Sequence, residues 1–191
     1  RSLENFGAAG ERLPLEIVYA MVRLKWACAR ANRRLGLLPA RKAAAIVSAC
    51  RRILGGGLDS QFAVDVFQAG SGTSSNMNVN EVVANLACVS LGGKRGERAL
   101  VHPNDDVNRG QSTNNVFPSA IKMASVEHSE ILLGHLAGLA RQLRRKGAAF
   151  ARVLKSGRTH LQDAVPITLG QEFNAYARAL EKGADRIRQA S

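Results

Sequence analysis

Three short stretches of the chain concentrate small hydrogen-bonding side chains, and each precedes a helical pattern. They read GSGTSSNMN at 70–78, HPNDDVNRGQSTNN at 102–115 and GRTHLQDAVP at 157–166. Hydroxyl and amide groups beside the free N–H groups at the start of a helix bind anions. The three stretches therefore suit the recognition of carboxylate oxygens.

The first stretch offers Ser71, Thr73 and Asn76 as donors, and its two glycines permit unusual backbone angles. Three interpretations stay open, namely a small-anion site, a plain helix cap and a dinucleotide-binding turn. The last of these lacks its third glycine, because Ser75 occupies that place, and no βαβ pattern follows.

The second stretch offers six polar candidates. Its groups at a helix start would be unremarkable as a cap, but the loop before them already holds more polar groups than capping needs. The candidates are Ser112, Thr113 and Asn114 at the helix start, and His102, Asn104 and Asp105 in the loop.

The third stretch places Thr159 beside His160 in a predicted loop over 155–168. A lone histidine in a loop is more often structural than catalytic. Imidazole nevertheless titrates near neutrality and exchanges protons at working pH, so a role in acid–base chemistry stays open. His128 and His135 lie seven apart in a helical pattern and are interpreted as residues of a helix face or core.

The remaining reactive residues indicate no metal or nucleophile chemistry. Neither metal-ligand spacing nor a Ser-His-Asp order is present in the sequence. The three cysteines fall in helical patterns and are interpreted as inert core thiols: Cys28, Cys50 and Cys88.

Helical periodicity must position these groups. The longest pattern is apolar on more than one side, which predicts packing in a bundle. We expect a strand or a loop entry at 62–67 and a loop over 94–112. The predicted helices cover 13–34, 39–54, 73–91, about 114–145, and the chain from Leu169 onward.

The net charge of +12 is large for 191 residues. The excess lies in residues 1–60 and 116–191, on predicted helix faces with few aromatic residues between the basic ones, so nucleic-acid binding is disfavoured. No apolar run is long enough to cross a bilayer. We expect a cytoplasmic protein that has no membrane or nucleic-acid partner.

At the three polar stretches the chain resembles the fumarase/aspartase superfamily, most closely its class II fumarases. GSGTSSNMNVNEVVAN, HPNDDVNRGQST and GRTHLQDAVPITLGQE stand in that family's usual order and separation, and RSLENF is similar to the start of such enzymes. The resemblance implies a mainly α fold, with an N-terminal helical domain over 1–112 and the first long helices of a central helix bundle over 113–191. It also implies a homotetramer whose active sites each draw on three chains.

The reaction that the resemblance to class II fumarases implies is the reversible addition of water to fumarate, giving malate, without metal or organic cofactor. By resemblance, His160 acts on the water that adds or leaves and Thr159 assists it. His102, Asn104 and Asp105 match a second anion site. The residues implied to hold substrate carboxylates are Ser71, Thr73, Asn76, Ser112, Thr113 and Asn114.

Two alternatives to a fumarate hydratase stay open. Aspartate ammonia-lyases share the dicarboxylate framework, but they usually carry Gln at the position of His160. The other alternative is a non-catalytic module for helical oligomerisation or anion binding.

The sequence departs from the family pattern in two places. Asn115 stands where the family usually has Asp. The chain ends before the mobile loop with its Ser base and Lys, and it lacks the acidic partner of His160. Since it also starts at Arg1 and ends within an amphipathic pattern, we expect a piece of a longer protein that is incomplete for catalysis.

Overall fold

The computed structural model describes residue 4 and residues 9–191, and the chain divides into two compact units, 1–124 and 125–191. Apart from Glu4, the N-terminal RSLENF stretch lies outside the described residues. Helices dominate both units, which confirms the predicted mainly α fold. The predicted domain boundary after residue 112 stays a prediction, because it concerns the domains of a longer protein.

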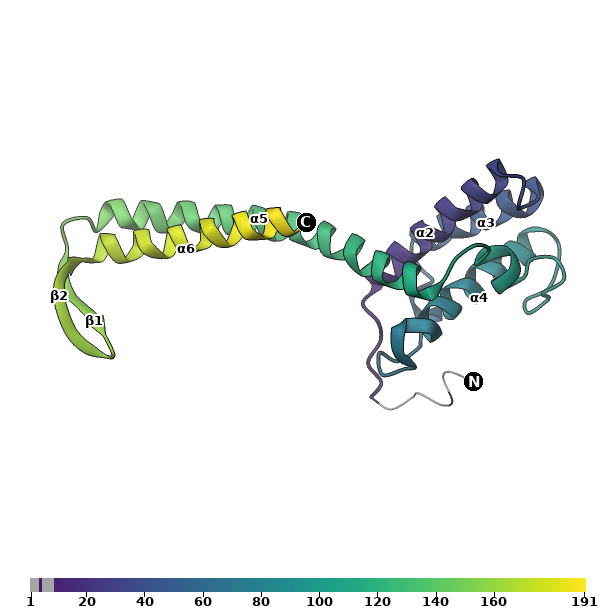
Figure 1. The fold of residues 1–191 in the computed structure, drawn as a ribbon, viewed down its shortest axis with the longest axis horizontal. Coiled ribbons are helices and arrows are strands. Elements are labelled where there is room, and N and C mark those ends of the chain that lie inside the picture. Colours follow the sequence, from purple (N-terminus) through teal and green to yellow (C-terminus); the bar gives the residue numbers. More distant parts are fainter. Residues whose placement is uncertain (1–3, 5–8) are drawn as a thin grey trace. The chain divides into compact units, whose positions relative to one another are not determined.

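Three helices pack around the core of the first unit (Figure 1). They are α2 (Leu15–Arg34), α3 (Ala40–Leu54) and α4 (Thr73–Ser90), each within two residues of its predicted start and end. A proline immediately precedes α2 and α3, where its fixed φ favours helix entry. Apolar side chains that the core buries almost completely include Met21, Val22, Ile46, Ile53, Val79 and Val83.

Two connections of the first unit refine the prediction. Residues 62–67 form no strand, and their only ladder contact among the described residues is an isolated bridge between Arg12 and Asp65. The predicted loop over 94–112 was wrong in part, because Pro103–Val107 forms one helical turn. The cause is local, because the His102 side chain accepts hydrogen bonds from the backbone N–H groups at the start of that turn.

The second unit is a helical hairpin built from α6 and the part of α5 that follows residue 124. Helix α5 (Thr113–Ala149) extends beyond its predicted end, and α6 (Leu169–Ala190) begins at the predicted residue. The two helices run side by side in Figure 1. Their close approach depends on glycine, because a Cβ on Gly170 would lie 2.4 Å from the carbonyl oxygen of Gly147.

A two-stranded antiparallel sheet replaces the loop predicted over 155–168. Strand β1 (Leu154–Thr159) pairs with β2 (Gln162–Thr168), and their register shifts between Ser156 and Arg158. The prediction was wrong because the strands carry many polar, exposed side chains and the turn holds no glycine. Neither strand therefore has the alternating apolar pattern that usually marks one.

Large apolar side chains stay exposed on the second unit. Both His128 and His135 lie on its surface, as the interpretation of a helix face predicted. Within the part of the chain that the structure describes, no helix combines the length and apolar character needed to cross a membrane. The exposed apolar residues include Ile131, Leu132, Leu139, Leu154, Val165 and Tyr176.

Replacing Gly72 by Ala should destabilise the first unit. Gly72 has φ +72°, and a Cβ there would lie 2.5 Å from the ring of Phe117. A left-handed backbone angle together with overpacking should cost about 2 kcal/mol or more. Thermal unfolding should show a melting temperature lower by roughly 4–8 °C. The matched control is Gly70→Ala, where a Cβ meets nothing within 4 Å, and an equal loss there would contradict this explanation.

Replacing Asp65 by Asn should weaken the first unit in a pH-dependent way. Backbone N–H groups of Phe67, Ala9 and Gly10 donate to its buried carboxylate and hold its pKa below the ordinary value. The stability that this carboxylate contributes is present above the pKa of the unfolded chain, near 4, and is lost as pH falls through the lower folded pKa.

Melting curves recorded from pH 3 to 7 check this expectation. The gap between wild type and Asp65→Asn should be widest at neutral pH and should narrow as the pH falls. Asp185→Asn, at an exposed ion pair of α6, is the control and should show little gap at any pH. A gap at Asp65 that is constant with pH would contradict the role of the ionised carboxylate.

Candidate functional site

The start of α4 is capped from outside the first polar stretch. Gln68 accepts a hydrogen bond from the Ser75 backbone N–H at 2.9 Å and donates to the Ser75 hydroxyl at 2.8 Å. Ser71 and Thr73 make no side-chain cap to α4, and both are exposed. Both hydroxyls are thus open to solvent, and that of Ser71 donates to the carbonyl oxygen of Gly70 at 2.7 Å.

Asn76 joins the first polar stretch to the second. Its side-chain nitrogen donates to the Thr113 hydroxyl oxygen at 3.0 Å and approaches Oδ1 of Asn108 at 3.4 Å. The side chain is buried, and its Oδ1 has no hydrogen-bond partner among the described residues. The structure therefore brings the starts of α4 and α5 together through two of the predicted site residues.

Of the other candidates at the start of α5, Ser112 lines an open hollow and Asn114 does not. Ser112 and Asn114 are exposed, and the backbone N–H of Asn114 donates to the Ser112 hydroxyl at 3.3 Å. The hollow has a volume of about 670 Å³ and is lined by the 104–105 and 108–112 segments. Asn115, where the family usually has Asp, also lines it.

His102 is fixed by the turn that follows it. Its Nδ1 accepts backbone N–H groups of Asn104 at 3.3 Å and Asp105 at 3.0 Å, an arrangement that leaves the ring proton on Nε2. Asp106 stabilises the turn. Its carboxylate accepts a hydrogen bond from the backbone N–H of His102 at 2.8 Å and forms an ion pair with Lys42 at 2.7 Å. The three residues predicted as a second anion site thus share one short turn.

Lys25 is a residue that sequence reasoning missed. It lies on α2 and is 0% exposed, and its Nζ donates to Oδ1 of Asn108 at 2.7 Å and Oε1 of Gln111 at 3.0 Å. Burial lowers the pKa of this ammonium to about 8. The available signal was its spacing, because it follows Met21 by four residues and precedes Ala29 by four on the buried face of α2.

The third polar stretch lies in the second unit, at the tip of the β hairpin. Thr159 pairs with Gln162, so the turn contains only His160 and Leu161, with φ of 49° and 61°. Two successive positive φ angles define a type I′ turn, which normally takes Asn and Gly. Each such angle at an ordinary residue costs on the order of 1–3 kcal/mol and is typical of functional sites. His160 is exposed on this strained turn.

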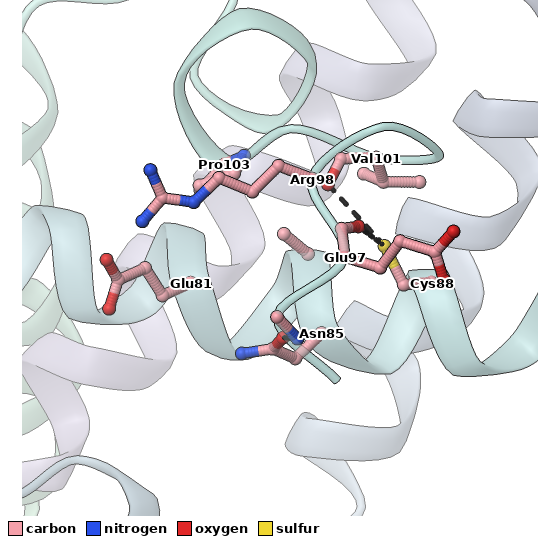
Figure 2. A pocket seen from close by; sticks show the side chains of 9 residues that line it. Glu81, Asn85, Cys88, Glu97, Arg98, Val101 and Pro103 are labelled. Atoms are coloured by element: carbon pink, nitrogen blue, oxygen red, sulfur yellow. Dashed lines mark hydrogen bonds between the residues drawn. The ribbon is translucent and has the colours of Figure 1, made fainter. Parts of the chain in front are cut away.

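A separate cavity of about 190 Å³ lies between α4 and the 96–103 segment and contains no predicted site residue. Figure 2 shows Cys88 at its edge, where the thiol donates to the carbonyl oxygen of Glu97 at 2.9 Å. Cys50 is also buried, and burial raises its thiol pKa to about 12, as expected of an inert core thiol. Cys28 is half-buried. The described residues contain no group of three or more His, Cys, Asp or Glu that could hold a metal ion.

Known proteins match the chain over its full length. A family model described as "Lyase" matches residues 1–191. A class II fumarate hydratase from Ralstonia nicotianae is 51% identical over 191 residues, which are 100% of this chain and 41% of that protein. An aspartate ammonia-lyase from Pseudomonas aeruginosa is 48% identical over 193 residues, covering 99% of this chain and 40% of that protein.

The fold matches a solved structure equally well. The crystal structure of a fumarate lyase:delta crystallin from Brucella melitensis has a TM-score of 0.91 and 49% identity, over 99% of this chain and 44% of that chain. The chain spans about two fifths of the length of the curated relatives that it matches. Because sequence and fold agree from end to end, the chain belongs to this lyase family, the fumarase/aspartase superfamily.

Proposed function

We propose that the chain is part of a class II fumarate hydratase, which adds water reversibly to fumarate to give malate. The observation that carries the proposal is the hydrogen bond from Asn76 to Thr113, because it places two donor-rich helix starts side by side. The printed function of the Ralstonia nicotianae relative, at 51% identity over the whole chain, supports this choice among dicarboxylate lyases.

The two helix starts suit the binding of a carboxylate whose charge grows during the reaction. Removing a proton next to a carboxylate spreads extra negative charge onto its oxygens. Preorganised donors stabilise that charge, and one such donor contributes about 2.7–4 kcal/mol in comparable oxyanion sites. We assign this role to Ser71 and Thr73 at the start of α4 and to Ser112, Thr113 and Asn114 at the start of α5. Asn76, also proposed as a substrate-site residue, would hold the two helix starts together, because its amide nitrogen already donates to Thr113 and Asn108.

His160 is proposed as the residue that protonates the departing hydroxyl and, in the reverse direction, activates the water. His160 is exposed in the tight hairpin turn. Thr159, the last residue of β1, would assist it. The base that removes the substrate proton is proposed to lie in the remainder of the longer protein.

A homotetramer is proposed for the complete protein. The second unit exposes apolar side chains of α5 such as Ile131, which is 61% exposed, and Leu139, which is 51% exposed. Contiguous exposed apolar residues mark surfaces that other helices cover. His102, Asn104 and Asp105 are proposed as a second anion site, and a cytoplasmic location without nucleic-acid partners stays part of the proposal.

Aspartate ammonia-lyase is the second candidate, favoured by the 48% identity to the Pseudomonas aeruginosa enzyme. A shared donor framework fits both reactions, since both release or add a small molecule beside a carboxylate. His160 argues for the hydratase, because ammonia-lyases of the family usually carry Gln there.

The complete protein should consume fumarate without added ammonium. Loss of the ultraviolet absorbance of fumarate, measured with and without ammonium, separates the two candidates. Consumption only in the presence of ammonium would establish the ammonia-lyase instead. A folded protein that is inactive under both conditions would contradict both candidates and favour a non-catalytic module.

Replacing His160 by Asn should lower turnover by at least about a hundredfold, the usual contribution of a general acid or base. Asn tolerates the left-handed backbone angle of this turn, so the hairpin should keep its shape while the titrating group is lost. Steady-state kinetics of the complete protein measure the effect. Leu161→Asn, at the other left-handed position of the same turn, is the control, and near-normal turnover of His160→Asn would contradict the catalytic role.

A further inference from the structure

The ammonium of Lys25 is a buried positive charge without a negative partner among the described residues. Its side chain is 0% exposed, and both groups within hydrogen-bond distance of Nζ are neutral amide oxygens, those of Asn108 and Gln111. The other buried charges of this unit are compensated, since Asp106 pairs with Lys42 and Asp65 accepts three backbone N–H groups.

A cation buried in this way is costly for the fold alone. Moving an ammonium out of water without an anion carries a large desolvation penalty, which amide oxygens offset only in part. Even a buried charge that has an ionic partner is weak evidence of a stabilising role, and Lys25 has no such partner among the described residues. The nearby thiols provide no compensation, because burial raises the pKa of Cys28 and Cys50 and keeps them neutral.

The contacts of Lys25 lead directly to the predicted carboxylate donors. Oδ1 of Asn108 accepts from both Lys25 and Asn76, and this fixes the orientation in which Asn76 also reaches Thr113. The Gln111 amide oxygen accepts from Lys25, so its nitrogen faces the Val107 carbonyl oxygen at 2.9 Å. Asn108 and Gln111 are the first and last residues of the 108–111 segment, which immediately precedes Ser112.

We propose that Lys25 is a positioning residue for dicarboxylate binding: it orients Asn108 and Gln111, and through Asn108 it orients Asn76. Its charge adds a favourable field for the dianion, which then supplies the negative charge that the fold lacks. The proposal rests on the proposed function, because it takes the ligand of the α4 and α5 helix starts to be a dicarboxylate.

Two variants of the complete protein test the role of the charge. Lys25→Met removes the ammonium, whereas Asn108→Asp keeps Lys25 and neutralises it with a carboxylate at the same place. Both variants remove the net positive charge that is buried at this place, but they change the packing in different ways. The matched control is Arg34→Met, which removes a positive charge from an exposed position in the last turn of the same helix.

The probe is succinate, a dicarboxylate that cannot be hydrated, and calorimetry gives its Kd. We expect Lys25→Met and Asn108→Asp each to raise this Kd, and the KM for fumarate, about tenfold or more, with a smaller effect on kcat. Arg34→Met should change neither value more than about twofold, since an exposed charge is screened. Melting temperatures of the free variants are measured beside the Kd, because a purely structural role of Lys25 predicts weaker binding only in proportion to a lower melting temperature.

The pH dependence gives an independent readout. Because burial lowers the pKa of Lys25 to about 8, the ammonium is present at pH 7 and is lost as pH rises through 8. The Kd for succinate should therefore rise above pH 8 in wild type. Lys25→Met should lack this part of the pH profile. The thiols of Cys28 and Cys50, whose pKa values are raised, do not titrate in this range.

The outcomes separate the two proposals. A wild-type protein that binds succinate and hydrates fumarate, with folded variants that bind succinate equally well, would overturn the role of Lys25 and leave the proposed function standing. A wild-type protein that does not bind succinate would overturn both. If the variants bind succinate more weakly only to the extent that their melting temperatures fall, Lys25 has a structural role alone. That result would also overturn the inference.

Discussion

Buried amide and carboxylate groups are costly without hydrogen-bond partners, and this cost shapes the polar loops of the first unit. Gln68 caps α4, His102 and Asp106 hold the turn before α5, and Asn76 reaches Thr113 across the gap between the two helix starts. Hydroxyl groups beside these contacts stay exposed at both helix starts, among them those of Ser71, Thr73 and Ser112. The Ser112 hydroxyl accepts only the backbone N–H of Asn114 among the described residues, so its proton is available for the proposed anion.

Periodicity predicted every long helix of the described chain because apolar spacing is a local property. The same reasoning placed the donor-rich stretches at helix starts. It failed where the determining contact was non-local or unusual. The hairpin over 154–168 has polar strands and a turn without glycine. The helical turn at 103–107 depends on the side chain of His102. Lys25 was hidden because a charged residue on a buried face is visible only once its partners are known.

Two features of the second unit are not explained by packing within this chain. Its hairpin turn holds His160 and Leu161 at left-handed angles, and α5 keeps large apolar side chains in solvent. Strain at a tip that carries an imidazole fits a site completed by other elements. An apolar helix face fits a bundle with further helices. Both features agree with a chain that spans about two fifths of its curated relatives.

We propose that the starts of α4 and α5 form a single carboxylate site. A crystal structure of the complete protein with succinate bound is the most direct test. We expect a carboxylate group within hydrogen-bond distance of Ser71 or Thr73 on one side and of Thr113 or Asn114 on the other. A succinate that occupies only the His102 turn, with the two helix starts free of ligand, would contradict it.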